Sequence, residues 1–267
     1  MSISADKLRE AVVVKIGGST LGSHDTTLDD LVDLQKRGVP TVVVHGGGEV
    51  ITRWLARQGV TTRFVRGLRV TDPESLAVAT AVLAGLVNKE LVAAVGARGG
   101  RAVGISGVDG RLLEARVRDP DLGYVGQVTR VNLGLVSTLL DAGYIPLVAP
   151  IAVFEETPPE GPVLLNVNAD TVAGELAAQM GARTLVFLTD VPGVMNDAGA
   201  LLPRMSRQEA QAILESGTAS GGMIPKIEAC LRALEMVPST RIVDGRVAGA
   251  LAACLEGAEV GTTMVSE

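Results

Sequence analysis

This 267-residue chain has few aromatic residues, few cysteines and no excess of basic residues, and each of these shortages argues against a class of function. Aromatic residues make up 2% of the chain, too few for base-stacking platforms or aromatic cages. Its two cysteines, Cys230 and Cys254, fit neither a disulfide framework nor a zinc site, and we expect buried thiols. The 24 basic and 30 acidic residues give a net charge of −6, which argues against nucleic-acid and anionic-membrane partners.

Long apolar runs and common nucleotide-binding fingerprints are also missing from the sequence. No run reaches the roughly 18 apolar residues that span a bilayer, and the polar N-terminus lacks the apolar core of a signal peptide. We therefore expect a cytoplasmic protein with no membrane partner. The motifs G-x-x-x-x-G-K-[ST], G-x-G-x-x-G, H-R-D and D-F-G are absent, which disfavours a Walker-type ATPase, a Rossmann dehydrogenase and a protein kinase.

Short β-branched runs alternate with helical patterns along the whole chain. Continuous apolar runs are typical of strands covered on both faces, and i, i+3, i+4 spacing predicts the helices. The alternation predicts an α/β fold, a three-layer sandwich of helices around a mostly parallel open sheet. Strands are expected at residues 11–16, 41–45, 101–106, 145–151, 184–189 and 240–243, with helices at 49–58, from 71 onward, 168–179 and 224–236.

Two segments interrupt this alternation. Residues 111–131 and 191–206 combine glycine or proline turns with short apolar stretches, which predicts inserted β-hairpins. A proline-rich turn at residues 158–162 is the best candidate for a boundary near the middle. We expect a single domain, residues 1–267, whose two halves share one continuous sheet.

A glycine cluster follows each of the first two expected strands. Gly17 and Gly18 follow the first strand, and Gly46, Gly47 and Gly48 follow the second. Ligands of open α/β sheets bind beyond the carboxyl ends of the strands. Glycine there lets the backbone approach a ligand closely, and the amides of a following helix favour anions. The pair of clusters therefore predicts an anion or phosphate site.

Lysine is the rarer basic residue, because 19 of the 24 are arginine and only five are lysine. Lys15 ends the first expected strand beside Gly17, and Lys226 follows Gly221 and Gly222 at the start of a helix. Two lysines that converge on a glycine-lined site suit a transferring phosphoryl group, whose oxygens carry the charge. Two surface lysines are the alternative interpretation.

The sequence offers a carboxylate and few bases for the chemistry. Asp170 lies near the start of a helix that Asn168 is expected to cap, and it could hold two lysines or a metal. His45, at the end of a buried strand, is expected to be a structural hydrogen-bonding group. A hydroxyl acceptor usually needs a base, whereas a carboxylate with a pKa near 4 is already ionised at pH 7. The residues therefore favour phosphorylation of a carboxylate.

Eight segments occur in order along the chain: VVVKIGGS, VVVHGGG, GLRVTDPE, GLVNKELV, GYIPLVAPI, NVNADTVA, FLTDVPGV and GGMIPKI. The combination of GLRVTD with NVNAD is far more specific than a single glycine turn. From about residue 12 to residue 265, the sequence resembles the amino acid kinase family, and within it the N-acetylglutamate kinases.

The resemblance implies the amino acid kinase fold and ATP-dependent phosphorylation of the side-chain carboxylate of N-acetyl-L-glutamate, a step of arginine biosynthesis. It implies that Lys15 and Lys226 stabilise the phosphoryl group, that Asp170 organises both lysines, and that Mg²⁺ bridges the phosphates. It also implies an acyl-amino-acid lobe over about residues 1–160 and a nucleotide lobe over about 161–267. The implied substrate contacts are Gly47, Gly48, Arg69 (on the α-carboxylate) and Asn166, and the implied nucleotide contacts are Gly17, Gly18, Asp190, Gly193, Ser220, Gly221 and Gly222.

Some departures from the family pattern bear on assembly and specificity. About ten residues precede the first expected strand, whereas arginine-inhibited members resemble one another in a longer N-terminal helix that joins dimers into hexamers. We therefore expect a homodimer without arginine feedback. Residues 49–51 and 61–66 are less typical and leave the acyl-group preference open. The alternatives are a kinase for carrier-protein-bound aminoadipate or glutamate, another small-molecule kinase of this fold, or a non-catalytic nucleotide or metabolite sensor.

Overall fold

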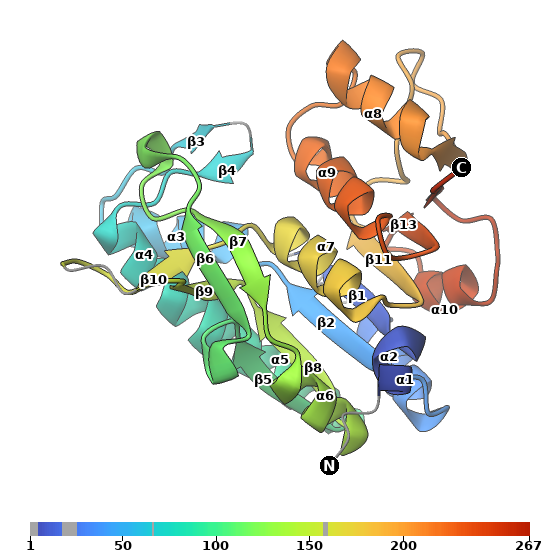
Figure 1. The fold of residues 1–267 in the computed structure, drawn as a ribbon, viewed down its shortest axis with the longest axis horizontal. Coiled ribbons are helices and arrows are strands. Elements are labelled where there is room, and N and C mark those ends of the chain that lie inside the picture. The colour runs from blue at the N-terminus through green and yellow to red at the C-terminus, as the bar shows by residue number, and fades with distance from the viewer. Residues whose placement is uncertain (1–4, 18–25, 66, 157–159) are drawn as a thin grey trace.

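An eight-stranded, mostly parallel sheet forms the centre of the computed structural model (Figure 1), which describes residues 5–17, 26–65, 67–156 and 160–267. Gly18, His24 and two prolines of the expected boundary, Pro158 and Pro159, lie outside these ranges. Strands from both halves of the chain share the sheet, as the sequence predicted. Their order is β12 (Arg204–Ser206), β14 (Thr262–Val265), β13 (Ser239–Asp244), β11 (Thr184–Thr189), β1 (Val12–Ile16), β2 (Thr41–His45), β8 (Ile145–Ala149) and β5 (Ala102–Ser106).

The pairing in this sheet is parallel except between β13 and β14. Strand β1 lies at its centre, with Lys15 in register with Val44 of β2 and with Phe187 of β11. Every residue of β1, β2 and β11 is buried, because helices cover both faces of the sheet. The carboxyl end of β1 therefore lies between a strand of the first half of the chain, β2, and a strand of the second half, β11.

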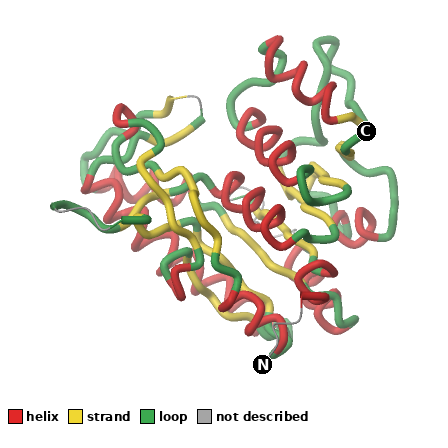
Figure 2. The backbone as a smooth tube through the Cα atoms, viewed as in Figure 1, coloured by secondary structure: helices red, strands yellow, loops and turns green. Residues whose placement is uncertain are grey.

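Two layers of helices cover the sheet, which confirms the expected sandwich (Figure 2). Alternate residues of β1 point to opposite faces, so that Val13 packs in one core and Val14 in the other. Helices α1 (Ala5–Glu10), α6 (Gly134–Asp141), α7 (Ala169–Met180), α8 (Arg207–Ser216) and α9 (Met223–Ala233) contribute to the core of Val13. Helices α2 (Thr27–Lys36), α3 (Gly48–Arg57), α4 (Pro73–Thr80), α5 (Asn88–Ala97) and α10 (Ala250–Leu255) contribute to the other.

A second, four-stranded sheet lies beside the first and corrects one predicted strand. The apolar run at residues 145–151 is divided at Pro150, after which the chain leaves β8 and enters this second sheet. Proline has no N–H to donate to a ladder, so it suits the point where a strand changes sheets. The order is β10 (Leu164–Asn166), β9 (Ile151–Phe154), β6 (Leu113–Val117) and β7 (Gly126–Val131), and β6 with β7 forms the hairpin predicted at residues 111–131.

The hairpin predicted at residues 191–206 is much shorter than expected, because only one bridge forms within this segment. One antiparallel bridge joins Met195 to Leu201 around a turn at Asn196, whereas β12 pairs in parallel with β14 in the main sheet. Asn196 satisfies this turn with its own side chain, which accepts hydrogen bonds from the N–H groups of Ala198 and Ala200. The segment is therefore a looped connection that leads back to the sheet edge.

Helix α4 begins as the sequence predicted, with Asp72 accepting a hydrogen bond from the N–H of Ser75 and Pro73 in the first turn. A π-helical stretch (Ala81–Val87) joins α4 to α5 in one continuous helix, Pro73–Ala97. By length and composition this described helix could cross a membrane, a test that core helices also pass. Its residues Leu76, Val82 and Leu83 are buried in the fold.

Candidate active site

Asp170 lies between the two lysines that the sequence singled out. Lys15 Nζ forms an ion pair with Asp170 Oδ1 at 2.8 Å. Lys226 Nζ donates a hydrogen bond to Asp170 Oδ2 at 3.3 Å. Lys15 comes from the end of β1, Asp170 from the first turn of α7, and Lys226 from the first turns of α9. The fold thus joins three residues that are far apart in the sequence.

The electrostatics of this cluster keep Asp170 ionised. Burial opposes the charged carboxylate, since only 4% of the residue is exposed, but the charges of Lys15 and Lys226 outweigh burial and hold its pKa below the ordinary value. Asn168 caps α7 by accepting hydrogen bonds from the N–H groups of Asp170 and Thr171. This cap fixes the helix start that carries Asp170.

One cavity, of about 200 Å³, contains all four residues predicted to contact the acyl substrate. Gly47, Gly48, Arg69 and Asn166 line it together with Lys15 and Asp170. A Cβ at Gly47 would lie 2.8 Å from Leu83 Cδ2, so a side chain there would require Leu83 to shift. The first turn of α3 borders the cavity, as the sequence predicted from the glycines that precede it.

The side chain of Asn166 and the backbone carbonyl of Arg69 are connected through the hydroxyl of Thr71. The Asn166 side chain donates to Thr71 Oγ1 at 3.2 Å, and the Thr71 hydroxyl donates to the Arg69 carbonyl at 2.9 Å. Thr71 is fully buried. The two motifs GLRVTD and NVNAD therefore form adjoining walls of one cavity.

A buried network supports the glycine turn at the end of β2. His45 Nδ1 lies 2.9 Å from the Gly46 carbonyl, and its Nε2 lies 3.0 Å from Asn88 Nδ2, which also donates to the Leu147 carbonyl. Since the Asn88 amide nitrogen can only donate, the geometry assigns the ring proton to Nδ1. Burial lowers the pKa of His45 to about 4 despite the bond to Gly46, so the ring is neutral at pH 7. His45 has the structural hydrogen bonds that the sequence predicted.

A second cavity, of about 370 Å³, contains four of the residues predicted to contact the nucleotide. Asp190, Gly193, Ser220 and Gly222 line it, and Lys226 forms part of its wall. Lys226 thus lies between the two cavities, in contact with Asp170, which lines the first cavity. The sequence did not single out Val194, Met195, Thr218, Ala219 and Met223 as contacts, although they also line the cavity.

Two nucleotide-contact predictions are placed near these cavities but outside their described linings. Gly17 donates its N–H to the Leu188 carbonyl at 3.2 Å, which pairs the end of β1 with β11. Gly221 lies beside the β3 (Phe64–Val65) and β4 (Leu68–Arg69) hairpin, where a Cβ on Gly67 would lie 3.2 Å from the Gly221 carbonyl oxygen. The hairpin therefore lies against the glycine turn at Gly221, which comes from the second half of the chain.

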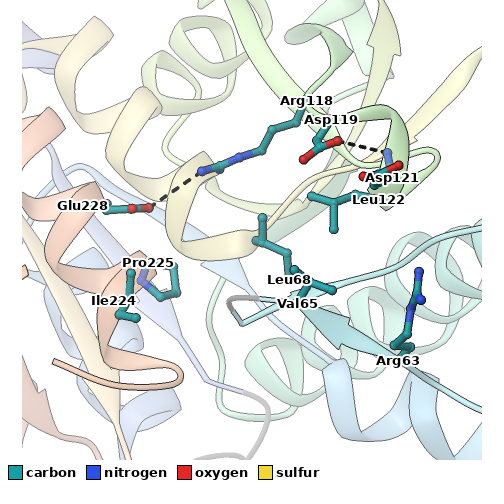
Figure 3. Close-up of a pocket in the computed structure, with 10 residues that line it drawn as sticks. All are labelled: Arg63, Val65, Leu68, Arg118, Asp119, Asp121, Leu122, Ile224, Pro225 and Glu228. Carbon is teal, nitrogen blue, oxygen red and sulfur yellow. Dashed lines mark hydrogen bonds and ion pairs between the residues drawn. The ribbon is translucent and has the colours of Figure 1, made fainter. Parts of the chain in front are cut away.

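A larger cleft, of about 830 Å³, lies between this hairpin, the loop after β6 and helix α9 (Figure 3). Its lining contains none of the predicted site residues. Leu68 and Pro225 on its walls directly precede Arg69 and Lys226, so the cleft borders the site without sharing its side chains. Arg118 and Glu228 approach across it, with 4.0 Å between Nη2 and Oε2.

Two lysines that share one buried carboxylate, at the junction of two cavities, suit phosphoryl transfer between small molecules on an open α/β fold. The chain belongs to the amino acid kinase family, which its residues 10–244 match.

Relatives of known name span nearly the whole chain. An acetylglutamate kinase of Dehalococcoides mccartyi is 45% identical over 257 residues, which cover 96% of this chain and 94% of that protein. An acetylglutamate kinase of Methanothrix thermoacetophila is 42% identical, with 90% and 86% covered. A solved N-acetylglutamate synthase of Neisseria gonorrhoeae superposes with a TM-score of 0.83 at 28% identity, over 98% of this chain and 61% of that one.

Proposed function

We propose that this chain phosphorylates the side-chain carboxylate of N-acetyl-L-glutamate with ATP, as a step of arginine biosynthesis. The acetylglutamate kinases at 42–45% identity support this substrate. The observation that carries the proposal is the position of Asp170, which holds a lysine from each side where the two cavities meet. The intact cluster also disfavours a non-catalytic sensor on the same fold.

The reaction needs no general base. The substrate carboxylate is ionised at pH 7, and one of its oxygens attacks the γ-phosphorus of ATP. A bond forms between that oxygen and phosphorus, the bond from phosphorus to the β,γ-bridging oxygen breaks, and the products are an acyl phosphate and ADP. Neither histidine nor cysteine occurs among the described residues that line the two cavities, which fits a reaction without proton abstraction.

The cluster supplies charge where the reaction develops it. Lys15 and Lys226 neutralise the phosphoryl oxygens, which carry the charge in a loose transition state. Asp170 holds the two ammonium groups near each other despite their mutual repulsion, so they are positioned before ATP binds. The remaining assignments are Gly47, Gly48, Arg69 and Asn166 to the acyl substrate, and Gly17, Gly18, Asp190, Gly193, Ser220, Gly221 and Gly222 to the nucleotide.

The proposal includes Mg²⁺ carried by the nucleotide. Within the described residues there is no group of three His, Cys, Asp or Glu side chains that could hold a metal. The Asp170 carboxylate is engaged by two lysines, and Asp190 is the carboxylate that borders the nucleotide cavity. Mg²⁺ commonly binds through substrate phosphates, one or two carboxylates and water. The phosphate oxygens of ATP would therefore be its main ligands, and Mg²⁺ would neutralise part of their charge.

The two cavities support a division of labour within one domain. The residues of the nucleotide cavity lie between positions 189 and 226, and most residues of the substrate cavity precede position 155. We assign the acyl substrate to about residues 1–160 and the nucleotide to about 161–267, with Asn166 and Asp170 at the junction. We also propose a cytoplasmic homodimer without arginine feedback, which light scattering and an assay with added arginine test directly.

The decisive experiment measures ADP release with ATP, Mg²⁺ and N-acetyl-L-glutamate. Hydroxylamine is included in parallel samples, because an acyl phosphate converts it to a hydroxamate and releases phosphate. We expect hydroxamate in proportion to ADP. ADP release without hydroxamate, or turnover of carbamate or a carrier-protein-bound acid in place of N-acetyl-L-glutamate, would overturn the assignment.

A further inference from the structure

The guanidinium of Arg69 is held by three neutral oxygen atoms, two from helix α3 and one from Thr62. Its Nη1 donates to Thr62 Oγ1 at 3.1 Å, and its Nη2 donates to Thr52 Oγ1 at 2.8 Å and to the Gly48 carbonyl at 2.7 Å. These bonds account for three of the five N–H groups of an arginine. The other two, on Nε and Nη1, are available to a ligand in the cavity that Arg69 lines.

The charge of Arg69 has no acidic partner within ion-pair distance among the residues that the structure describes. The side chain is nevertheless buried, and burial lowers its pKa. A buried guanidinium solvated only by hydroxyl and carbonyl oxygens carries an uncompensated positive charge. Such a group favours an anionic ligand, and the planar guanidinium matches a carboxylate.

Thr52 connects this guanidinium to the glycine turn. Its hydroxyl accepts from Arg69 and donates to the Gly48 carbonyl at 2.9 Å, a pair of roles that one hydroxyl can fill at once. Thr52 lies one turn into α3, whose first residue is Gly48. Arg69 and Gly48, two groups assigned to the substrate, are therefore fixed relative to each other by one side chain.

Phe64 completes the support from the solvent side. Its ring centroid lies 4.8 Å from Arg69 Cζ, and 54% of the residue is exposed. A cation over a ring face at this distance is attracted to it, which restrains the plane of the guanidinium. Thr62 and Phe64 both belong to residues 61–66, and Thr52 directly follows residues 49–51. These are the stretches that depart from the family pattern.

We propose that Thr52, Thr62 and Phe64 are positioning residues that set the plane of the Arg69 guanidinium for the α-carboxylate of the acyl substrate. This inference rests on the proposed function, because it deepens the role of Arg69 in the same cavity. Thr52 is the central member, since it contacts both Arg69 and Gly48. Thr52 and Thr62 act through Arg69, and Phe64, which also lines the cavity, restrains the guanidinium plane. The three residues therefore control substrate affinity and selectivity for a carboxylate, and the phosphoryl transfer itself does not depend on them.

The test compares Thr52→Val, which removes the hydroxyl at nearly constant volume, with Thr52→Ser, which keeps it. We expect Thr52→Val to raise the KM for N-acetyl-L-glutamate about tenfold, the typical effect of one hydrogen bond to a charged group. The kcat and the KM for ATP should stay within about twofold. Thr52→Ser should restore the KM, and equal thermal unfolding of both variants controls for folding.

A substrate without the α-carboxylate makes the test decisive. N-acetyl-4-aminobutyrate keeps the reacting carboxylate and the acetamido group, so the ratio of KM values between Thr52→Val and wild type should fall to about one. A ratio that stays near tenfold would overturn the proposal, because Thr52 would then act elsewhere than on the bond from Arg69 to the carboxylate.

Calorimetric binding of the same two compounds separates this inference from the proposed function. Wild-type protein that binds N-acetyl-L-glutamate but transfers no phosphoryl group would overturn the proposed activity. The ratio of the Kd of Thr52→Val to the Kd of the wild type would still decide the role of Thr52. If another acyl amino acid is the substrate, the ratio is measured with that acid and its decarboxy analogue. A ratio near one for the intact acid would overturn the proposal.

Discussion

The two cavities of this protein are built from different kinds of structure. The substrate cavity is formed by the ends of central strands, the first turns of α3 and α7 and a buried arginine. The nucleotide cavity is formed largely by loops around residues 189–195 and 218–222. Regular secondary structure therefore holds the charged groups of the proposed acyl site, with Lys15 on β1, Arg69 on β4 and Asp170 on α7, whereas connecting loops shape the proposed nucleotide site. The lysines repeat this contrast, because Lys15 belongs to a strand and Lys226 to a helix start.

The largest expected effect tests the contrast between these lysines. Lys15→Ala should lower kcat by a factor on the order of 10³, and Lys226→Ala by about 10², as removal of a positioned charge near a reacting oxygen does. Lys15 is the more buried and makes the shorter contact with Asp170. Lys36→Ala, at an exposed residue of α2, is the matched control and should not change kcat. Steady-state kinetics measure all three, and equal losses for both lysines would contradict the contrast.

Acid should lower the free energy of unfolding through His45, whose ring supports the glycine turn at the end of β2. Its folded pKa is lowered to about 4 from 6.5, so the unfolded chain binds the proton at a higher pH than the folded chain does. Stability from neutral His45 is fully present above pH 6.5 and is lost as pH falls toward 4, by about 3 kcal/mol.

Urea unfolding at intervals between pH 6.5 and pH 4 measures this loss. The variant His45→Gln should lack this part of the pH dependence, while the carboxylates titrate alike in both proteins. Parallel curves for the variant and the wild type would show that His45 is protonated equally in the folded and unfolded chain.

Arg69→Ala should raise the KM for the acyl substrate by roughly 100-fold, because it removes the buried charge that we assign to the α-carboxylate. The KM for ATP should change little, since Arg69 lines the substrate cavity but does not line the nucleotide cavity. Arg63→Ala is the matched control, because Arg63 lies on the same hairpin segment but faces the large cleft (Figure 3). A similar rise in the KM for ATP would mean that the two cavities are less separate than we infer.

The smallest expected effect concerns the contact between the halves. Gly67 and Gly38 have nearly equal φ angles of +77° and +75°, so an alanine at either position should cost about 1 kcal/mol of stability. Only at Gly67 would the new Cβ approach the Gly221 carbonyl, whereas none of the described atoms lies within 4 Å at Gly38. Gly67→Ala should therefore also raise the KM for ATP a few fold. Identical kinetics for the two variants would exclude a role for this contact.

Much of the site could be predicted because its signals are local in the sequence. Glycines after apolar runs and rare lysines beside them predicted the ends of β1 and β2, and Asn168 predicted the start of α7. The supports of Arg69 could not be predicted, since Thr52, Thr62 and Phe64 meet it only through tertiary contacts. Pro150 divides an apolar run between two sheets, because pairing partners decide where a strand belongs and the run itself does not.

The position of β1 has a consequence for how this protein can be rearranged. The strand pairs with β2 from one half and with β11 from the other, and it carries Lys15 at the point where their ends meet. A cut between the halves would leave one of them with an exposed, unpaired edge of fully buried strand, which favours aggregation. Grafting a foreign nucleotide half would change the register in which Lys15 is held. The two halves therefore cannot be exchanged independently of each other. New acyl specificities are better sought by substitutions in the hairpin around Phe64 than by recombining halves from different proteins.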